Sequence, residues 1–104
     1  MTSLSLNTDA DVVELTRAIC DIESVSGNER VLADAIEATL APLSHLEVIR
    51  DGDAIIARTN LGRAKRVVIA GHIDTVPVAE NLPVKFLQFE REQVLWGRGT
   101  VDMK

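Results

Sequence analysis

Two stretches near the beginning of the chain repeat apolar residues at helical spacing. In the first, an apolar residue returns every three or four positions, which is typical of an amphipathic helix. Thr8 and Asp9 precede most of this stretch and carry side chains that favour a helix start. The pattern predicts a helix over about residues 9–22, with its apolar face formed by Val12, Leu15, Ile19 and Ile22.

The second stretch follows the polar segment SVSGNE, residues 24–29. Ser26 and Glu29 have the spacing of a capping box, in which each side chain bonds to the backbone N–H of the other residue. A second helix is expected to follow, and Pro42 ends it because proline cannot continue the helical hydrogen bonds. Its apolar face is predicted to consist of Leu32, Ala35, Ile36 and Leu40.

The periodicity then changes to short β-type runs. Residues 46–50 and 54–58 flank Asp51-Gly52, which is a strong signal for a hairpin turn. A second hairpin is expected from residues 84–89 and 93–96, around residues 90–92. Its aromatic side chains are interpreted as packing residues, and they are Phe86, Phe89 and Trp96.

Residues 66–70 form a β-branched run without alternating polar positions. Such a run is expected for a central strand that is covered on both faces. Two helices beside a strand of this kind indicate a layered domain. The predicted fold class is therefore α/β.

Composition and charge exclude several classes of partner. The chain has 104 residues and a net charge of −5, so it lacks the basic stripe that would neutralise phosphates, and no nucleic-acid partner is expected. No apolar run reaches the length of a membrane span, so no membrane partner is expected. The N-terminus shows no secretory signal, and the single Cys20 is interpreted as a buried thiol in a reducing compartment. These features predict a cytoplasmic protein.

The end of the run 66–70 carries residues suited to chemistry. His72 follows Gly71 at the carboxyl end of the predicted central strand, which is where open α/β sheets bind ligands. Imidazole is the commonest metal ligand in proteins, and Asp74 lies where its carboxylate could orient the ring. An isolated histidine would more simply be a surface loop residue, which is the interpretation of His45.

A second candidate constellation is WGRGTVDMK, residues 96–104. Glycines on both sides of Arg98 allow a tight turn, and Asp102 offers a carboxylate that could bridge two cations. The alternative interpretation is a glycine turn with a solvated aspartate. Ser24 and Ser26 could suggest a nucleophile, but no histidine is near them in the sequence and capping accounts for Ser26.

These motifs together resemble the dinuclear zinc aminoacylase family, which includes acetylornithine deacetylases, succinyl-diaminopimelate desuccinylases, carboxypeptidases and dipeptidases. The resemblance rests on residues 24–27, 71–77 and 97–104, which occur in the family's order. Residues 5–27 and 71–83 look most like the desuccinylases. Glu23 departs from the family pattern, because many relatives have proline there, and this is expected to alter only the end of the helix.

The resemblance implies that residues 1–104 are the N-terminal part of a three-layer α/β/α, aminopeptidase-like zinc-hydrolase domain. The rest of that domain and a dimerisation domain would lie outside this chain, and the full-length protein would be a homodimer. By the same resemblance, His72 ligates one of two zinc ions, with cobalt as an alternative metal. Asp74 acts in catalysis by orienting His72, Asp102 bridges both metals, and the Asp102–Met103 peptide bond is cis.

The implied activity is metal-dependent hydrolysis of a small N-acyl amino acid. The preferred reaction converts N-succinyl-LL-2,6-diaminopimelate to succinate and LL-2,6-diaminopimelate in lysine and diaminopimelate biosynthesis. The general base and the remaining metal ligands would lie beyond Lys104, so this chain alone is expected to be inactive. The alternatives are an acetylornithine deacetylase, another aminoacylase or dipeptidase, a non-catalytic metal-binding module, or a truncated product without activity.

Overall fold

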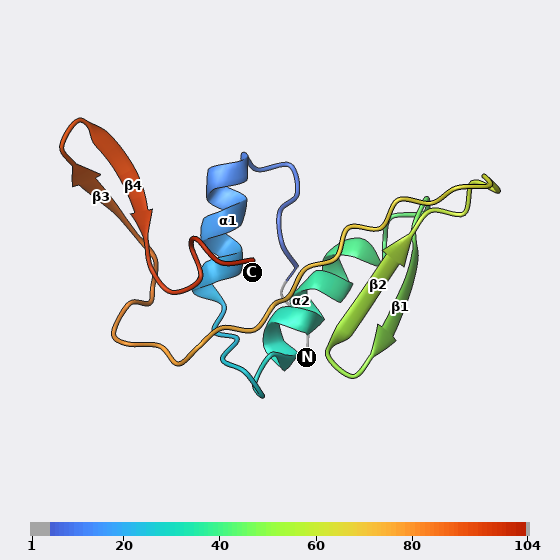
Figure 1. The fold of residues 1–104 in the computed structure, drawn as a ribbon, viewed down its shortest axis with the longest axis horizontal. Coiled ribbons are helices and arrows are strands. Elements are labelled where there is room, and N and C mark those ends of the chain that lie inside the picture. Colours follow the sequence, from blue (N-terminus) through green and yellow to red (C-terminus); the bar gives the residue numbers. More distant parts are fainter. Residues whose placement is uncertain (1–4, 104) are drawn as a thin grey trace.

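The computed structural model describes residues 5–103, so the first residues of the N-terminus and Lys104 of the last motif lie outside the described residues. The element order is two helices followed by two β-hairpins. The molecule is elongated, with extents of 50 × 30 × 25 Å and a radius of gyration of 15.4 Å (Figure 1). A compact domain of this length would have a radius of gyration of about 13 Å. The chain therefore has a small core relative to its length.

Helix α1 spans Val12–Asp21. Asp11 caps the N-terminus of this helix, and its carboxylate accepts a hydrogen bond of 2.9 Å from the N–H of Glu14. The predicted start at Thr8 and Asp9 is therefore two or three residues too early, because Asp11 supplies the cap instead. Cys20 is buried on this helix, as predicted.

Helix α2 spans Arg30–Leu40 and buries Leu32, Ala33 and Ala35, and it ends before Pro42 as predicted. The prediction of a capping box between Ser26 and Glu29 is wrong. The carboxylate of Glu29 accepts from the N–H of Gly27 at 2.8 Å, and the N–H of Ser26 donates instead to the carbonyl of Thr75. Because the N–H of Ser26 is bonded to Thr75, it is not available to the carboxylate of Glu29, and the reciprocal capping box does not form.

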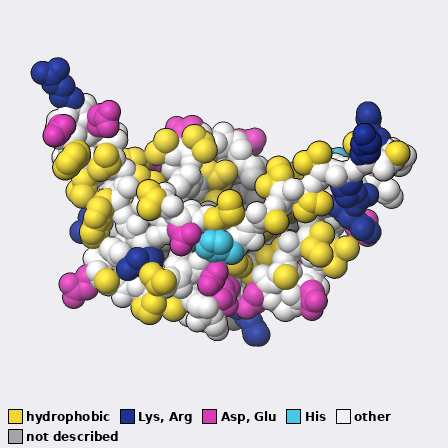
Figure 2. All heavy atoms as spheres, in the orientation of Figure 1, with side chains coloured by type: hydrophobic (Ala, Val, Ile, Leu, Met, Phe, Trp, Pro, Cys, Tyr) yellow, Lys and Arg dark blue, Asp and Glu magenta, His cyan; other side chains and the backbone are white. Residues whose placement is uncertain are grey.

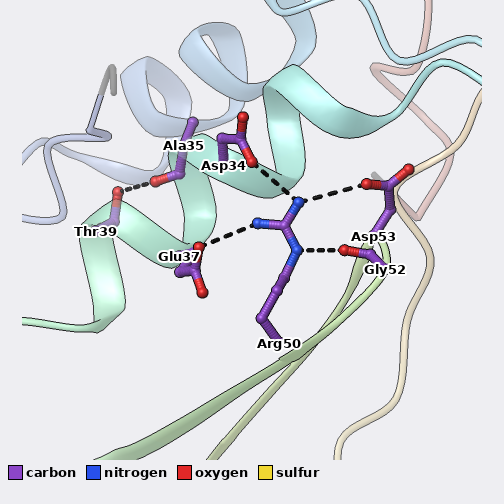
Figure 3. A network of polar contacts seen from close by, with 7 residues as sticks. All are labelled: Asp34, Ala35, Glu37, Thr39, Arg50, Gly52 and Asp53. Carbon is purple, nitrogen blue, oxygen red and sulfur yellow. Dashed lines mark hydrogen bonds and ion pairs between the residues drawn. The ribbon is translucent and has the colours of Figure 1, made fainter. Parts of the chain in front are cut away.

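The first hairpin pairs β1, Glu47–Asp51, with β2, Ala54–Arg58, in antiparallel register, which confirms the prediction. Gly52 occupies the turn with a φ of 60°. Arg50 attaches this hairpin to α2 and to the turn (Figure 3). Its guanidinium lies 3.0 Å from Asp34, 3.2 Å from Glu37 and 3.4 Å from Asp53. Burial tends to lower the pKa of Arg50, but these carboxylates outweigh that effect and raise it.

The second hairpin pairs β3, Lys85–Phe89, with β4, Glu92–Trp96, and it also confirms the prediction. Figure 1 shows it extending away from α1 at one end of the molecule. Its aromatic side chains, interpreted from the sequence as packing residues, are 37–65% exposed and pack only in part. Phe86 instead lies under the guanidinium of Arg17 of α1, 5.4 Å from the ring centre.

Residues 66–70 are the clearest failure of the sequence prediction. They form no strand, and Val67, Val68 and Ile69 are 89%, 76% and 96% exposed. Residues 5–103 contain two separate two-stranded sheets, and no strand of either sheet pairs with this segment. A central strand is buried only when other strands pair with it and helices cover it. The mixed α/β class is confirmed, whereas no three-layer arrangement is formed among the described residues. None of the helices in this part of the chain is long and apolar enough to cross a membrane.

Candidate metal site

The segment that carries His72 is attached to the loop between the two helices. Val25 and Thr75 form a parallel β-bridge. The N–H of Thr75 donates to the backbone carbonyl of Ser24, and the N–H of Ser26 donates to the backbone carbonyl of Thr75, both at 2.9 Å. The hydroxyl of Ser24 donates to the carbonyl of Ile73 at 2.6 Å. Ser24 and Thr75 are 0% and 4% exposed, so this junction is a buried part of the molecule.

The turn at residues 97–103 brings Asp102 to the same place. Gly97 lies so close to Val84 that an added Cβ would meet its Cγ2 at 2.8 Å, which leaves room only for glycine. The N–H of Arg98 donates to the carbonyl of Asn81 at 3.0 Å and fixes the start of the turn. At its other end, the side chain of Met103 covers Gly71, where an added Cβ would lie 3.2 Å from its Sδ.

His72 lies between two carboxylates. Its Nε2 is 3.2 Å from Oδ1 of Asp102, and its Nδ1 is 3.2 Å from Oδ1 of Asp74. Nδ1 also lies 3.2 Å from the backbone carbonyl of Asp74, with hydrogen-bond geometry. The three side chains are about half exposed. The structure therefore brings together all three site residues expected from the sequence, and their roles stay predictions.

The surface around this group is acidic. Figure 2 shows a histidine side chain near the middle of one face with several acidic side chains beside it. The other histidine, His45, is exposed and lies between α2 and β1, in agreement with its interpretation as a surface residue.

The backbone beside Asp102 differs from the expectation. The cis peptide bond among the described residues is Leu82–Pro83, and Asp102–Met103 is not cis. A non-proline cis bond costs about 3–4 kcal/mol and persists only where the surroundings enforce it. Here the turn is exposed around Val101, and the N–H of Met103 donates to the carboxylate of Asp102 at 2.8 Å.

A cavity of about 470 Å³ lies on the inner side of the histidine segment. It is bounded by residues 71–74 on one side, and by Ile36 and Leu40 of α2 and Ile55 of β2 on others. The cavity therefore combines apolar walls with the polar residues His72 and Asp74 of the candidate site.

His72 and Asp102 suit zinc in their chemistry, since imidazole nitrogen and carboxylate oxygen are ligands that zinc prefers. Two ligands at about 2.0–2.2 Å from a tetrahedral ion lie about 3.3–3.6 Å apart, and the observed 3.2 Å contact is close to that spacing. Among residues 5–103, no group of three or more His, Cys, Asp or Glu side chains is arranged to hold a metal ion. The pair fits zinc in kind and spacing, but it is smaller than the three-ligand set of a typical catalytic site.

No protein-family model matches the chain. A Mycobacterium tuberculosis protein provisionally named succinyl-diaminopimelate desuccinylase DapE is 50% identical over 100 residues, which cover 95% of this chain and 27% of that protein. The succinyl-diaminopimelate desuccinylase of Corynebacterium glutamicum is 47% identical over 96 residues, 90% of this chain and 25% of that protein. An Ajellomyces dermatitidis protein provisionally named as a carboxypeptidase is 32% identical over 111 residues, 92% of this chain and 26% of that protein.

The chain spans about a quarter of the length of the curated relatives it matches. The similarity extends over 95% of the chain, so it includes the loop at Ser24 and the histidine segment. The resemblance that the motifs indicate is therefore confirmed, and this chain is a relative of the succinyl-diaminopimelate desuccinylases.

Proposed function

We propose that this chain supplies part of the catalytic centre of a metal-dependent hydrolase of N-acyl amino acids. The preferred substrate is N-succinyl-LL-2,6-diaminopimelate, which gives succinate and LL-2,6-diaminopimelate. The observation that carries the proposal is the position of His72 between Asp74 and Asp102. The relatives named as desuccinylases support the choice of substrate.

The contacts of His72 are compatible with a metal ion bound at its Nε2. Nδ1 of the ring lies 3.2 Å from the backbone carbonyl of Asp74, which can only accept a hydrogen bond, and a proton on Nδ1 would leave the lone pair of the neutral ring at Nε2. In that tautomer the lone pair faces the carboxylate of Asp102 at 3.2 Å, and a cation between the two acceptors would satisfy both. A metal ion or a proton satisfies the pair, and the donor set is the one that zinc binds.

In this proposal His72 and Asp102 are metal ligands, and Asp74 is a positioning residue that fixes the tautomer and orientation of His72. Bound zinc or cobalt, two ions in the proposed full site, would lower the pKa of a water toward about 7 and polarise the amide carbonyl. The remaining ligands and the general base belong to the rest of the protein. Homodimer formation and a cytoplasmic location also stay predictions.

A chimera tests the proposal directly. The 96 residues of the Corynebacterium glutamicum protein that align with this chain are replaced by the residues of this chain. The purified chimera is loaded with zinc or cobalt and assayed with N-succinyl-LL-2,6-diaminopimelate, N-acetylornithine and a peptide with a free carboxyl terminus. We expect preferential hydrolysis of the succinyl substrate and its loss in His72→Ala, while the surface variant His45→Ala stays active.

Two results would overturn the proposal. Full turnover in a folded His72→Ala chimera would remove the metal-ligand role from this residue. Preferential hydrolysis of N-acetylornithine or of the peptide would instead show that the substrate is that of an aminoacylase or carboxypeptidase. Circular dichroism of each variant confirms that a loss of turnover is not a loss of fold.

A further inference from the structure

We propose that Ser24 is a positioning residue for the candidate metal site, acting through the peptide that joins Ile73 to Asp74. The inference rests on the proposed function for the role of His72 as a ligand. It concerns a hydroxyl that belongs to another part of the chain, 49 positions away from the carbonyl that it contacts.

The environment of Ser24 excludes a role as a nucleophile. The residue is 0% exposed, and its hydroxyl proton is directed at the carbonyl oxygen of Ile73 at 2.6 Å. A nucleophile must reach a substrate and be within reach of a base, and a buried hydroxyl that donates to a backbone carbonyl does neither. The same contact suits a role in holding the backbone in place.

Ser24 bonds to the carbonyl of Ile73, the residue between His72 and Asp74 in the sequence. Rotation of the Ile73–Asp74 peptide would displace both oxygens of Asp74 that face Nδ1 of His72, which are its carbonyl and its Oδ1. The bonds between Ser24, Ser26 and Thr75 fix the backbone after this peptide. The hydroxyl of Ser24 fixes the peptide itself, and therefore the acceptor that determines the tautomer of His72.

The chain offers two matched hydroxyls as controls. Thr39 on α2 is less buried than Ser24, but its hydroxyl also donates to a backbone carbonyl, that of Ala35, at 2.7 Å, and it accepts from Leu6 N–H (Figure 3 shows the contact with Ala35). Thr75 is as buried as Ser24, but its Oγ1 has no hydrogen-bond partner. Thr39→Ala therefore removes a comparable bond on a helix, from a hydroxyl that does not contact the histidine segment, and Thr75→Val removes a neighbouring hydroxyl without a bond.

The experiment measures the ring nitrogens of His72 by ¹⁵N NMR in the 104-residue chain, at a pH where the imidazole is neutral. We expect mainly the Nδ1–H tautomer in the original sequence and a shift toward the Nε2–H tautomer in Ser24→Ala. Zinc titration of the same samples should show affinity at His72 reduced about threefold to tenfold, at or below the lower end for groups that contact a ligating histidine. Thr39→Ala and Thr75→Val should keep both values.

Each outcome decides the matter. An unchanged tautomer in Ser24→Ala overturns the positioning role. An equal tautomer change in Thr39→Ala also overturns it, because the change would then reflect a general loss of stability. A tautomer change confined to Ser24→Ala in a chain whose histidine binds no zinc supports the positioning role and overturns the proposed metal site. If Ser24→Ala does not fold, Ser24→Cys keeps the shape of the side chain with a slightly larger and weaker donor. It should give an intermediate tautomer ratio, and a ratio equal to the original overturns the proposal.

Discussion

The Nε2 atom of His72 lies 3.2 Å from Oδ1 of Asp102, although the two residues belong to separate motifs at residues 71–77 and 97–104. Two contacts produce this approach. The bridge between Val25 and Thr75 fixes the histidine segment, and the close packing of Gly97 on Val84 fixes the turn before Asp102. An imidazole nitrogen and a carboxylate oxygen at this distance make the pair a candidate cation site.

Removal of the Asp74 carboxylate should weaken the site only moderately. In the chimera described above, Asp74→Ala is expected to lower zinc affinity or turnover about tenfold, the lower end of the range for partners of a ligating histidine. The reason is that the backbone carbonyl of Asp74, 3.2 Å from Nδ1, is retained in the variant. Wild-type metal content and turnover in Asp74→Ala would show that Asp74 is only a loop residue.

The 104-residue chain itself should not hydrolyse amides. His72 and Asp102 are fewer ligands than a catalytic zinc normally has, and the candidate bases Glu80, Glu90 and Glu92 are exposed in loops or in the second hairpin. The check is incubation of the purified chain with zinc and N-succinyl-LL-2,6-diaminopimelate. Turnover above a zinc-only control that disappears in His72→Ala would contradict this prediction.

Loss of Arg50 should destabilise the contact between α2 and the first hairpin. Its side chain is 19% exposed and contacts three carboxylates, so Arg50→Met should cost about 1–2 kcal/mol in the free energy of unfolding, measured with urea. Arg58→Met is the matched control, because Arg58 pairs with Glu47 alone and is 44% exposed. Equal losses in the two variants would mean that the Arg50 cluster has no special role in stability.

The exposed segment at residues 67–69 should make the chain associate with itself. Extended, apolar backbone without a neighbouring strand is a template for pairing with another copy. Sedimentation velocity over a range of concentrations should therefore reveal oligomers, and Val68→Lys should reduce them. Val31→Lys is the control, since Val31 is 60% exposed but lies on α2, where the helix satisfies the backbone. A monomer at all concentrations would refute the prediction.

The local elements could be predicted from the sequence because their determinants are local. The turn at Gly52 and the apolar spacing in α2 specify a hairpin and a helix through neighbouring residues. The start of α1 was misplaced by a few residues because several nearby side chains can cap a helix, and only the structure identifies Asp11. The candidate site residues His72, Asp74 and Asp102 can be singled out because polar side chains stand out beside glycines and apolar runs, and the structure brings them together while their roles stay predictions.

The rest depends on contacts between distant residues. The apolar run at 66–70 is suited to burial, but burial requires strands and helices beside it, which the described residues do not provide. The capping box failed because the backbone of Ser26 pairs with Thr75. The hydrogen bond from Ser24 to Ile73 had no signal in the spacing, although both residues lie in or beside the motifs.

Zinc titration of the ¹⁵N-labelled chain, prepared without a histidine tag, is the most direct test of the metal site. We predict a saturable change at Nε2 of His72 that is weakened in Asp102→Asn, while His45, exposed and outside the site, serves as the internal control and stays unchanged. An equal response of both histidines, or an Asp102→Asn variant that binds zinc as the original chain does, would contradict the assignment of His72 and Asp102 as a metal-binding pair.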